Sequence, residues 1–127
     1  MKYLDVIKLA ESVGFYMDEG NVSVDYDVSY GYLNFQDFKT NYFDYACLEI
    51  EYDINNDKEY LKIYTNIKLN NHHQIYFSAD EILRINYNKT TKTQIKKTLE
   101  YYYNYFSLEY KKLSNKIRLY NMKKDFN

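Results

Sequence analysis

Carboxylates recur at every second position in two stretches of the sequence. Glu49, Glu51 and Asp53 alternate with apolar residues, and so do Asp25 and Asp27. Because side chains at i and i+2 of a strand share a face, each set would line one face of a sheet. Clustered carboxylates can hold Mg²⁺ for phosphodiester hydrolysis, so a metal nuclease is one interpretation of this pattern.

Such a nuclease also needs a lysine on the same face as its carboxylates, and the sequence does not place one there. The nearest match is Glu59-Tyr60-Leu61-Lys62, and residues three apart on a strand face opposite sides. Glycine occurs only at positions 14, 20 and 31, which excludes a glycine-rich phosphate loop. We therefore expect no catalytic residue, no metal site and no cofactor, and we interpret the protein as a non-enzyme.

The histidines and the cysteine have simpler interpretations. His72 and His73 are adjacent, so on a strand they point to opposite faces and cannot ligate one ion from one side. Cys47 is the only cysteine, which excludes an internal disulfide framework and a cysteine-rich zinc module. We expect a polar histidine pair beside a turn, and we expect Cys47 to be a small apolar side chain at a covered position.

Two further interpretations of the carboxylates remain open. In one, they form a solvated face, and Lys62 and Lys68 of the next strand pair with Glu49, Glu51 and Asp53. In the other, they form a negative surface that docks on a basic groove of another protein, with tyrosines supplying affinity and acids supplying specificity. The candidate partner-binding residues are Asp25, Asp27, Glu49, Glu51, Asp53, Tyr60 and Tyr64.

The two halves of the chain carry opposite charge. Residues 1–60 hold four lysines and thirteen acids, a net charge of −9, whereas residues 61–127 hold thirteen basic residues and five acids, a net charge of +8. These charges pair with one another if the halves interleave in space. Otherwise the basic half offers an alternative function, nucleic-acid binding by a helix whose tyrosines at 101, 103 and 105 stack on bases. Its candidate residues are Lys96, Lys97, Lys111, Lys112, Lys116 and Arg118.

Hydrophobic periodicity predicts the elements that position these residues. Apolar residues at three- and four-residue spacing predict a helix over 2–13, ended by Gly14. Alternation predicts four main strands, over 22–30, 47–54, 59–69 and 72–77. In the first strand we expect the valines and tyrosines to be buried and Asp25 and Asp27 to be wet. Gly31 would turn the chain into a return strand over 32–35, followed by a loop over 36–44.

The C-terminal part is predicted to be helical. Ser78 with Glu81 has capping-box spacing and predicts a short helix to about Ile85, and Thr91 with Gln94 repeats the pattern at the start of a long helix over about 92–121. Its apolar stripe consists of Ile95, Leu99, Tyr102, Phe106, Tyr110, Leu113, Ile117 and Tyr120. Thirty helical residues span about 45 Å and nine-residue strands about 30 Å. We therefore expect either a break near 114–115 or packing of the helix end against another copy or a partner.

Together these elements predict one α+β domain over residues 1–127. Its expected architecture is an antiparallel four- to five-stranded meander with an N-terminal helix, a short helix and a long C-terminal amphipathic helix. No apolar run approaches the ~18 residues that span a bilayer, and the first residues do not form a signal-peptide core, so we expect a cytoplasmic protein.

Composition and surface chemistry together suggest a class of function. Residues with A/T-rich codons predominate, with fifteen Lys, fourteen Asn and eighteen Tyr, which indicates an A/T-rich bacterium or its mobile elements. We expect a non-catalytic protein-binding module of the phage or mobile-element type, such as an anti-defence inhibitor of a host nuclease or a toxin-neutralising protein. Its expected partner is a basic protein such as a nucleic-acid-handling enzyme, and a homodimer through the long helix is a further expectation.

Overall fold

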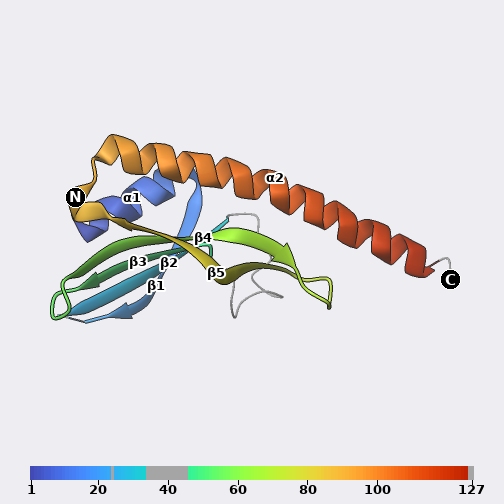
Figure 1. Ribbon diagram of the computed structural model, residues 1–127, viewed down its shortest axis with the longest axis horizontal. Coiled ribbons are helices and arrows are strands. Elements are labelled where there is room, and N and C mark those ends of the chain that lie inside the picture. Colours follow the sequence, from blue (N-terminus) through green and yellow to red (C-terminus); the bar gives the residue numbers. More distant parts are fainter. Residues whose placement is uncertain (24, 34–45, 126–127) are drawn as a thin grey trace.

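Two helices lie on one face of a five-stranded antiparallel sheet (Figure 1). The computed structural model describes residues 1–23, 25–33 and 46–125. The strand order is β1-β2-β3-β4-β5, so the predicted α+β class and meander are confirmed. The elements are α1 (Tyr3–Val13), β1 (Phe15–Val22), β2 (Tyr26–Leu33), β3 (Leu48–Asp53), β4 (Lys58–Leu69), β5 (Ile75–Asn86), the 3-10 helix η1 (Tyr87–Lys89) and α2 (Lys92–Asp125).

The predicted N-terminal helix and its glycine end are confirmed in α1. Val6, Leu9 and Ala10 are the residues that α1 buries against the rest of the chain. Gly14 ends the helix at φ 129°, a conformation that favours glycine, and its N–H donates to the carbonyls at positions 10 and 11. A Cβ at Gly14 would meet the Tyr103 ring at 3.0 Å, so this glycine also lets α2 approach the end of α1 closely.

The long helix α2 begins with the predicted capping box. The Thr91 N–H donates to Gln94 Oε1 and the Gln94 N–H donates to Thr91 Oγ1, both at 3.2 Å. The helix then runs without a break to Asp125, so the alternative of a break near 114–115 is wrong. The inward part of its apolar stripe is buried in the core at Ile95, Leu99 and Phe106, and the Phe106 ring packs on Phe77 of β5.

The sheet covers more of the length of α2 than was expected from strands of nine residues. Strands β4 and β5 are each twelve residues long, and their connecting turn reaches the far part of the helix. There His73 stacks on Tyr120, with ring centroids 3.7 Å apart and planes at 16°. Beyond Tyr120 the end of α2 projects past the sheet, as Figure 1 shows.

The first predicted strand, over 22–30, is wrong because the chain turns within it. Val22 ends β1, a strand that we did not predict, and Tyr26 begins β2. Local hydrogen bonds hold the turn: the Ser23 N–H donates to Asp27 Oδ1 at 3.2 Å, and Ser23 Oγ donates to the Tyr26 carbonyl at 2.9 Å. Gly31 lies inside β2 rather than at a turn, so a return strand over 32–35 is also wrong for 32–33. The rest of that strand and the loop over 36–44 lie outside the described residues.

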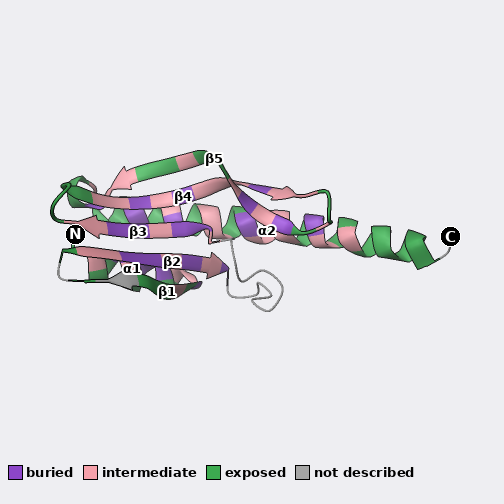
Figure 2. Cartoon of the chain, turned by 90° about the horizontal axis from the view of Figure 1, so that it is seen from below, coloured by how far each residue is buried: buried purple, intermediate pink, exposed green. Residues whose placement is uncertain are grey.

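The faces of β2 are the reverse of those expected with respect to the helices, although Val28 is buried as predicted. Ser29 lies on the helix side, where its hydroxyl forms a short hydrogen bond with Tyr3 of α1. Gly31 is on the same side, and a Cβ there would come within 2.8 Å of the Leu48 Cβ. Small residues beneath α1 permit this close packing, whereas Val28 lies on the opposite face. Figure 2 shows the resulting mixture of buried and half-buried residues along β2.

The predicted short helix over 78–85 is wrong, because these residues belong to β5. The Asp80 N–H donates to Ser78 Oγ at 3.2 Å, which makes a local turn and not a helix cap. This turn forms a bulge, since Asn66 pairs with Ser78 but Tyr64 pairs with Ile82. The Asp80 carboxylate braces the bulge by accepting from Asn66 Nδ2 at 3.2 Å and from Lys68 Nζ at 2.7 Å.

This brace makes stability depend on pH in the acidic range. The hydrogen bond from Lys68 is the largest of the effects that lower the pKa of Asp80 from 3.8 to about 2. A carboxyl whose pKa is lowered on folding stabilises the protein above pH 3.8, and this stabilisation is lost as pH falls through about 2. We expect Asp80→Asn to lose less thermal stability than the wild type between these pH values. Equal losses in the two proteins would contradict this prediction, and Lys68→Gln should reproduce the smaller loss.

Candidate interaction surface on the sheet

The sheet face away from α1 and α2 has no helix over it among the described residues, and Figure 2 views it from this side. We call it the open face. The strand register places on it the side chains of Tyr16, Asp18, Tyr26, Val28, Tyr30, Tyr32, Glu49, Glu51, Asp53, Tyr60, Lys62, Tyr64 and Arg84. Lys58, Ile82 and Asn86 lie on the same face, so tyrosines and charged residues make up most of the surface but not all of it.

A row of paired residues crosses the open face. Tyr30 pairs with Glu49, which pairs with Lys62 and then Arg84. Asp18 of β1 continues this row at the other edge, opposite Tyr30. The acids thus lie toward β1–β3 and the cations toward β4–β5, so the face is dipolar and not uniformly acidic.

Tyrosine hydroxyls hold the two central carboxylates. Tyr64 donates to Glu49 Oε2 at 2.7 Å, and Tyr26 donates to Glu51 Oε2 at 3.3 Å. Burial, followed by the nearby glutamates, raises the pKa of both hydroxyls above the usual value for tyrosine. The tyrosines therefore remain protonated donors at neutral pH, and the carboxylates are fixed as acceptors.

Glu51 is the most deeply placed charge on the open face. Only 7% of the residue is exposed, although it faces away from both helices. Lys62 Nζ lies 3.7 Å from Glu51 Oε1, which is an ion pair but too long for a hydrogen bond. Glu51 Oε1 is buried and has no hydrogen-bond donor among the described residues. A buried carboxylate oxygen without a donor is costly, and a donor from a bound molecule would relieve that cost.

The structure brings five of the seven predicted partner-binding residues onto one face. These five are Glu49, Glu51, Asp53, Tyr60 and Tyr64. Asp25 lies exposed at the β1–β2 turn, and Asp27 lies on the helix side of β2, opposite Tyr52. Asp27 was misplaced because the faces of β2 are the reverse of those expected.

Asp27 instead lines a cleft of about 540 Å³ beside α1. The other residues that line the cleft include Tyr3, Tyr52, Glu59, Met1 and Asn88. Burial raises the pKa of the Tyr3 hydroxyl, so this phenol remains neutral. The cleft is separate from the open face and contains none of the other predicted site residues.

Sequence reasoning missed Tyr26 and Tyr30 as members of this surface. Both had been assigned to a buried face, although their alternation with acidic residues was recognised. Tyr30 lies opposite Glu49 in the strand register, and burial, then the charges of Glu49 and Glu51, raises the pKa of Tyr30. The only signal available in the sequence was the excess of eighteen tyrosines over seven phenylalanines.

The interpretation of the carboxylates as a charge-paired face is correct for only one pair. Lys62 does pair with Glu51. Lys68 pairs with Asp80 of β5 and not with β3, because β3 begins at Leu48, opposite Ile63, and does not extend as far as Lys68.

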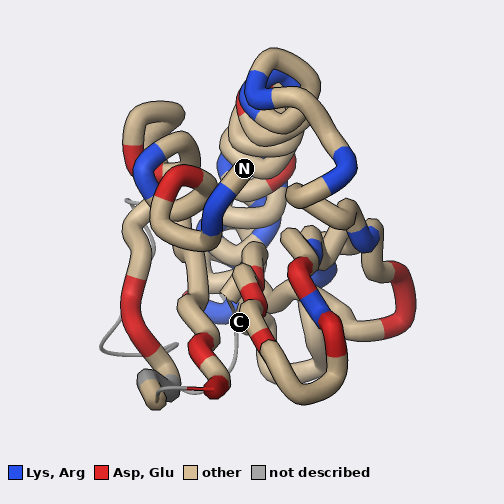
Figure 3. Tube along the Cα trace, turned by 90° about the vertical axis from the view of Figure 1, so that its left-hand side faces the viewer, with Lys and Arg blue, Asp and Glu red and all other residues tan. Residues whose placement is uncertain are grey.

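The basic residues proposed for nucleic-acid binding are all exposed on α2. Figure 3 shows blue segments on α2 and red segments along the strands and turns of the sheet. At 3.6 residues per turn these cations spread around the exposed side of the helix and do not form one stripe. Lys112 also pairs with Glu109, with 3.2 Å between Nζ and Oε1. The residues are Lys96, Lys97, Lys111, Lys112, Lys116 and Arg118.

Only two of the three tyrosines expected to stack on bases are exposed. Tyr103 packs edge-on against Phe15, with ring centroids 5.0 Å apart, and is half-buried. Tyr101 and Tyr105 are exposed, and their rings are parallel with centroids 6.4 Å apart.

The cysteine and the histidines serve structural roles. Cys47 is fully buried in the core, where its Sγ donates to the Gly31 carbonyl at 3.4 Å, and burial raises the pKa of its thiol. This confirms the small covered side chain predicted for it. His72 and His73 lie in the β4–β5 turn and not on a strand. In the part of the chain that the structure describes, no three His, Cys, Asp or Glu side chains are arranged to hold a metal ion.

Comparison with known proteins identified no relative of this chain. No family model, no curated protein and no solved structure matches the chain. Over the described ranges, neither helix is long and apolar enough to cross a membrane. Inferences about function therefore rest on the surface chemistry of the chain itself.

Proposed function

We propose that this protein is a non-catalytic binding module that docks its open face on a basic surface of another protein. The observation that carries the proposal is Glu51 Oε1, a buried acceptor without a donor in the middle of a face that no described helix covers. An arginine or lysine N–H of a partner would supply the missing hydrogen bond. Charge-assisted hydrogen bonds of this kind are about twice as strong as neutral ones.

The tyrosines around Glu51 support an interface rather than a simple solvated face. Tyr26, Tyr30, Tyr60 and Tyr64 are each half-buried before any partner binds. Two of them are already fixed by hydrogen bonds to carboxylates, so little side-chain entropy remains to be lost on docking. Large, ordered aromatic side chains of this kind commonly dominate the affinity of protein interfaces.

The distribution of charge favours a basic partner on the β1–β3 side. Asp18, Glu49, Glu51 and Asp53 lie there, at intervals along neighbouring strands. A groove that binds nucleic-acid phosphates carries cations at comparable intervals, so such a groove would complement these acids. An inhibitor of a nucleic-acid-handling enzyme, or a protein that neutralises a toxin of that kind, is the class of activity that suits this surface.

Charge reversal on the two sides of the molecule tests the proposal. Proteins are captured from a nuclease-treated lysate of an A/T-rich bacterium on wild type, Asp18→Lys, Glu49→Lys and Lys97→Glu. We expect a specific protein to be retained by wild type and Lys97→Glu and to bind at least about a hundredfold more weakly to the other two, because apposed like charges cost several kcal/mol.

The controls separate a failed interface from a failed fold. Asp18 is exposed at the sheet margin, so Asp18→Lys should unfold at the wild-type temperature. Retention by Asp18→Lys and Glu49→Lys with loss only in Lys97→Glu, or capture only from a parallel lysate without nuclease treatment, would contradict the proposal and favour nucleic-acid binding by α2.

A further inference from the structure

The outer side of α2 carries a second regular stripe, which the sheet does not use. Its positions are separated by alternating steps of four and three residues, the spacing of a helix–helix seam. The stripe extends about 32 Å at 1.5 Å per residue. We call it the outer seam, and it consists of Tyr101, Tyr105, Leu108, Lys112, Asn115, Leu119 and Met122.

The apolar members of the outer seam are unusually open to solvent. Leu108 is 60% exposed, and Tyr101, Leu119 and Met122 are each at least half exposed. Leu119 and Met122 flank Tyr120, whose ring stacks on His73 of the β4–β5 turn, and both side chains are open to solvent.

We propose that the outer seams of two copies of this chain pack together antiparallel and form a homodimer. The seam is complementary to itself, because apolar residues occupy both ends and polar residues occupy the middle. In the antiparallel register that keeps seam positions facing each other, Leu108 lies against Leu119 of the second copy and Tyr105 against Met122. A two-fold axis repeats each of these contacts.

The polar middle of the seam selects the antiparallel arrangement. In this register Lys112 meets Asn115 of the second copy, so the ammonium faces an amide oxygen that can accept from it. A parallel pair would place Lys112 against Lys112 and would align the two helix dipoles unfavourably.

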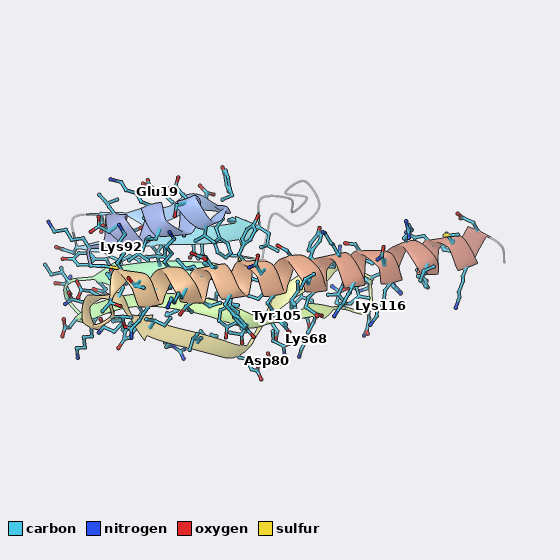
Figure 4. All side chains as sticks on the ribbon, turned by 90° about the horizontal axis from the view of Figure 1, so that it is seen from above. Glu19, Lys68, Asp80, Lys92, Tyr105 and Lys116 are labelled. Carbon is cyan, nitrogen blue, oxygen red and sulfur yellow. The ribbon has the colours of Figure 1, made fainter. Side chains whose placement is uncertain are left out.

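One flank of the seam carries charges that suit the same register. Glu109 and Lys116 lie along the Tyr105 side of α2, and the antiparallel register brings Glu109 close to Lys116 of the second copy. Figure 4 shows Tyr105 and Lys116 on the same side of the helix. On the other flank Lys111 approaches Arg118 of the second copy, which opposes association.

The available area indicates a reversible dimer. Five apolar or aromatic side chains that are 39–62% exposed, at roughly 200 Å² each, offer on the order of 500 Å² per copy, or about 1,000 Å² in total, near the lower limit for a specific interface. Nine basic and three acidic residues lie on α2, so the two helices also repel. Salt screens this repulsion, and we expect the dimer to become tighter as NaCl rises from about 0.05 to about 0.5 M.

The first test measures mass against concentration. Sedimentation equilibrium of the full chain from about 5 to about 500 µM should show a monomer–dimer equilibrium. Leu108→Glu should raise the dissociation constant by at least about a hundredfold. The two-fold axis repeats the substitution, so the dimer loses two apolar contacts and must bury two carboxylates. The matched control is Leu4→Glu, since Leu4 of α1 is also 60% exposed but lies off the seam. A wild type that stays monomeric, or an equal effect of Leu4→Glu, would overturn the proposal.

The second test fixes the register. In the double variant Leu108→Cys/Leu119→Cys, the cysteine at position 108 of one copy faces the cysteine at position 119 of the other copy. Mild oxidation should therefore give a covalent dimer in high yield. Each single variant should cross-link poorly, because two residues 108 would lie about 16 Å apart along the helix axes. Efficient cross-linking of the single variants would indicate a parallel pair and overturn the antiparallel assignment. Cys47 stays in place because it is fully buried.

The outer seam and the open face can be tested independently. They lie on opposite sides of the molecule, with the sheet and the inward side of α2 between them. Leu108→Glu should therefore leave capture of a protein by the open face intact. Loss of both properties in this one variant would contradict their independence.

Discussion

Replacing Phe106 with alanine is expected to lower the free energy of unfolding by about 3–5 kcal/mol. Phe106 is fully buried at the centre of the inward stripe of α2. Its ring meets Phe77 of β5 edge-on at a centroid distance of 4.9 Å and lies 5.6 Å from the Tyr102 ring. Truncation would leave a cavity between α2 and the sheet, and neither element can collapse far into it. Urea unfolding measures the loss.

Leu108 provides the matched control for this substitution. It lies two residues further along the same helix and is 60% exposed in the single chain. At protein concentrations that keep the chain monomeric, Leu108→Ala should change stability by less than about 0.5 kcal/mol. Similar losses for Phe106→Ala and Leu108→Ala would mean that α2 does not pack on the sheet through the inward stripe.

Replacing Lys62 with methionine is expected to cost about 3 kcal/mol of stability at neutral pH. Methionine keeps most of the length of the side chain but removes the cation that lies 3.7 Å from Glu51 Oε1. The Glu51 side chain is only 9% exposed, so it would be left buried without its counterion. Removing one partner of a buried ion pair is costly because of the charge that is left behind. Chemical unfolding of Lys62→Met measures this cost.

Two variants identify the cause of the loss in Lys62→Met. Adding Glu51→Gln removes the stranded charge, so the double variant should recover most of the stability. Lys68→Met breaks an ion pair that is shorter, at 2.7 Å, but exposed, and it should cost much less. A loss in Lys68→Met as large as that in Lys62→Met would contradict the special role of burial at Glu51.

The helical stripe of α2 and the alternation in β3 and β4 were predicted correctly because each has only one consistent packing. The inward stripe of α2 repeats over more than twenty residues, and its capping box is formed as expected. The alternation in β3 and β4 was equally clear. Because every second residue of a strand lies on the same face, the sequence alone placed Glu49, Glu51 and Asp53 together. Tyr60 and Tyr64 follow from the same rule on β4.

The errors arose where tertiary contacts decide between local alternatives. The alternation in β2 is equally compatible with Val28 or with Ser29 facing the helices. Ser29 takes that side because Tyr3 of α1 approaches it closely, and no local sequence pattern reveals this contact. Ser78 and Glu81 have the spacing of a helix cap, but the long strand β4 pairs with this segment, and Ser78 serves a bulge instead. The dipolar character of the open face also depended on the pairing of β4 with β5, which brings Arg84 beside Lys62.

Hydroxyl-radical footprinting of the tyrosines tests most directly whether the open face is the docking surface. The protein is footprinted alone and with the protein that it captures, and modification is quantified at each tyrosine by mass spectrometry. We predict that the partner reduces modification at Tyr26, Tyr30, Tyr60 and Tyr64 and leaves Tyr101 and Tyr105 unchanged. Protection of Tyr101 and Tyr105, with no change at the four tyrosines of the sheet, would contradict the proposed function.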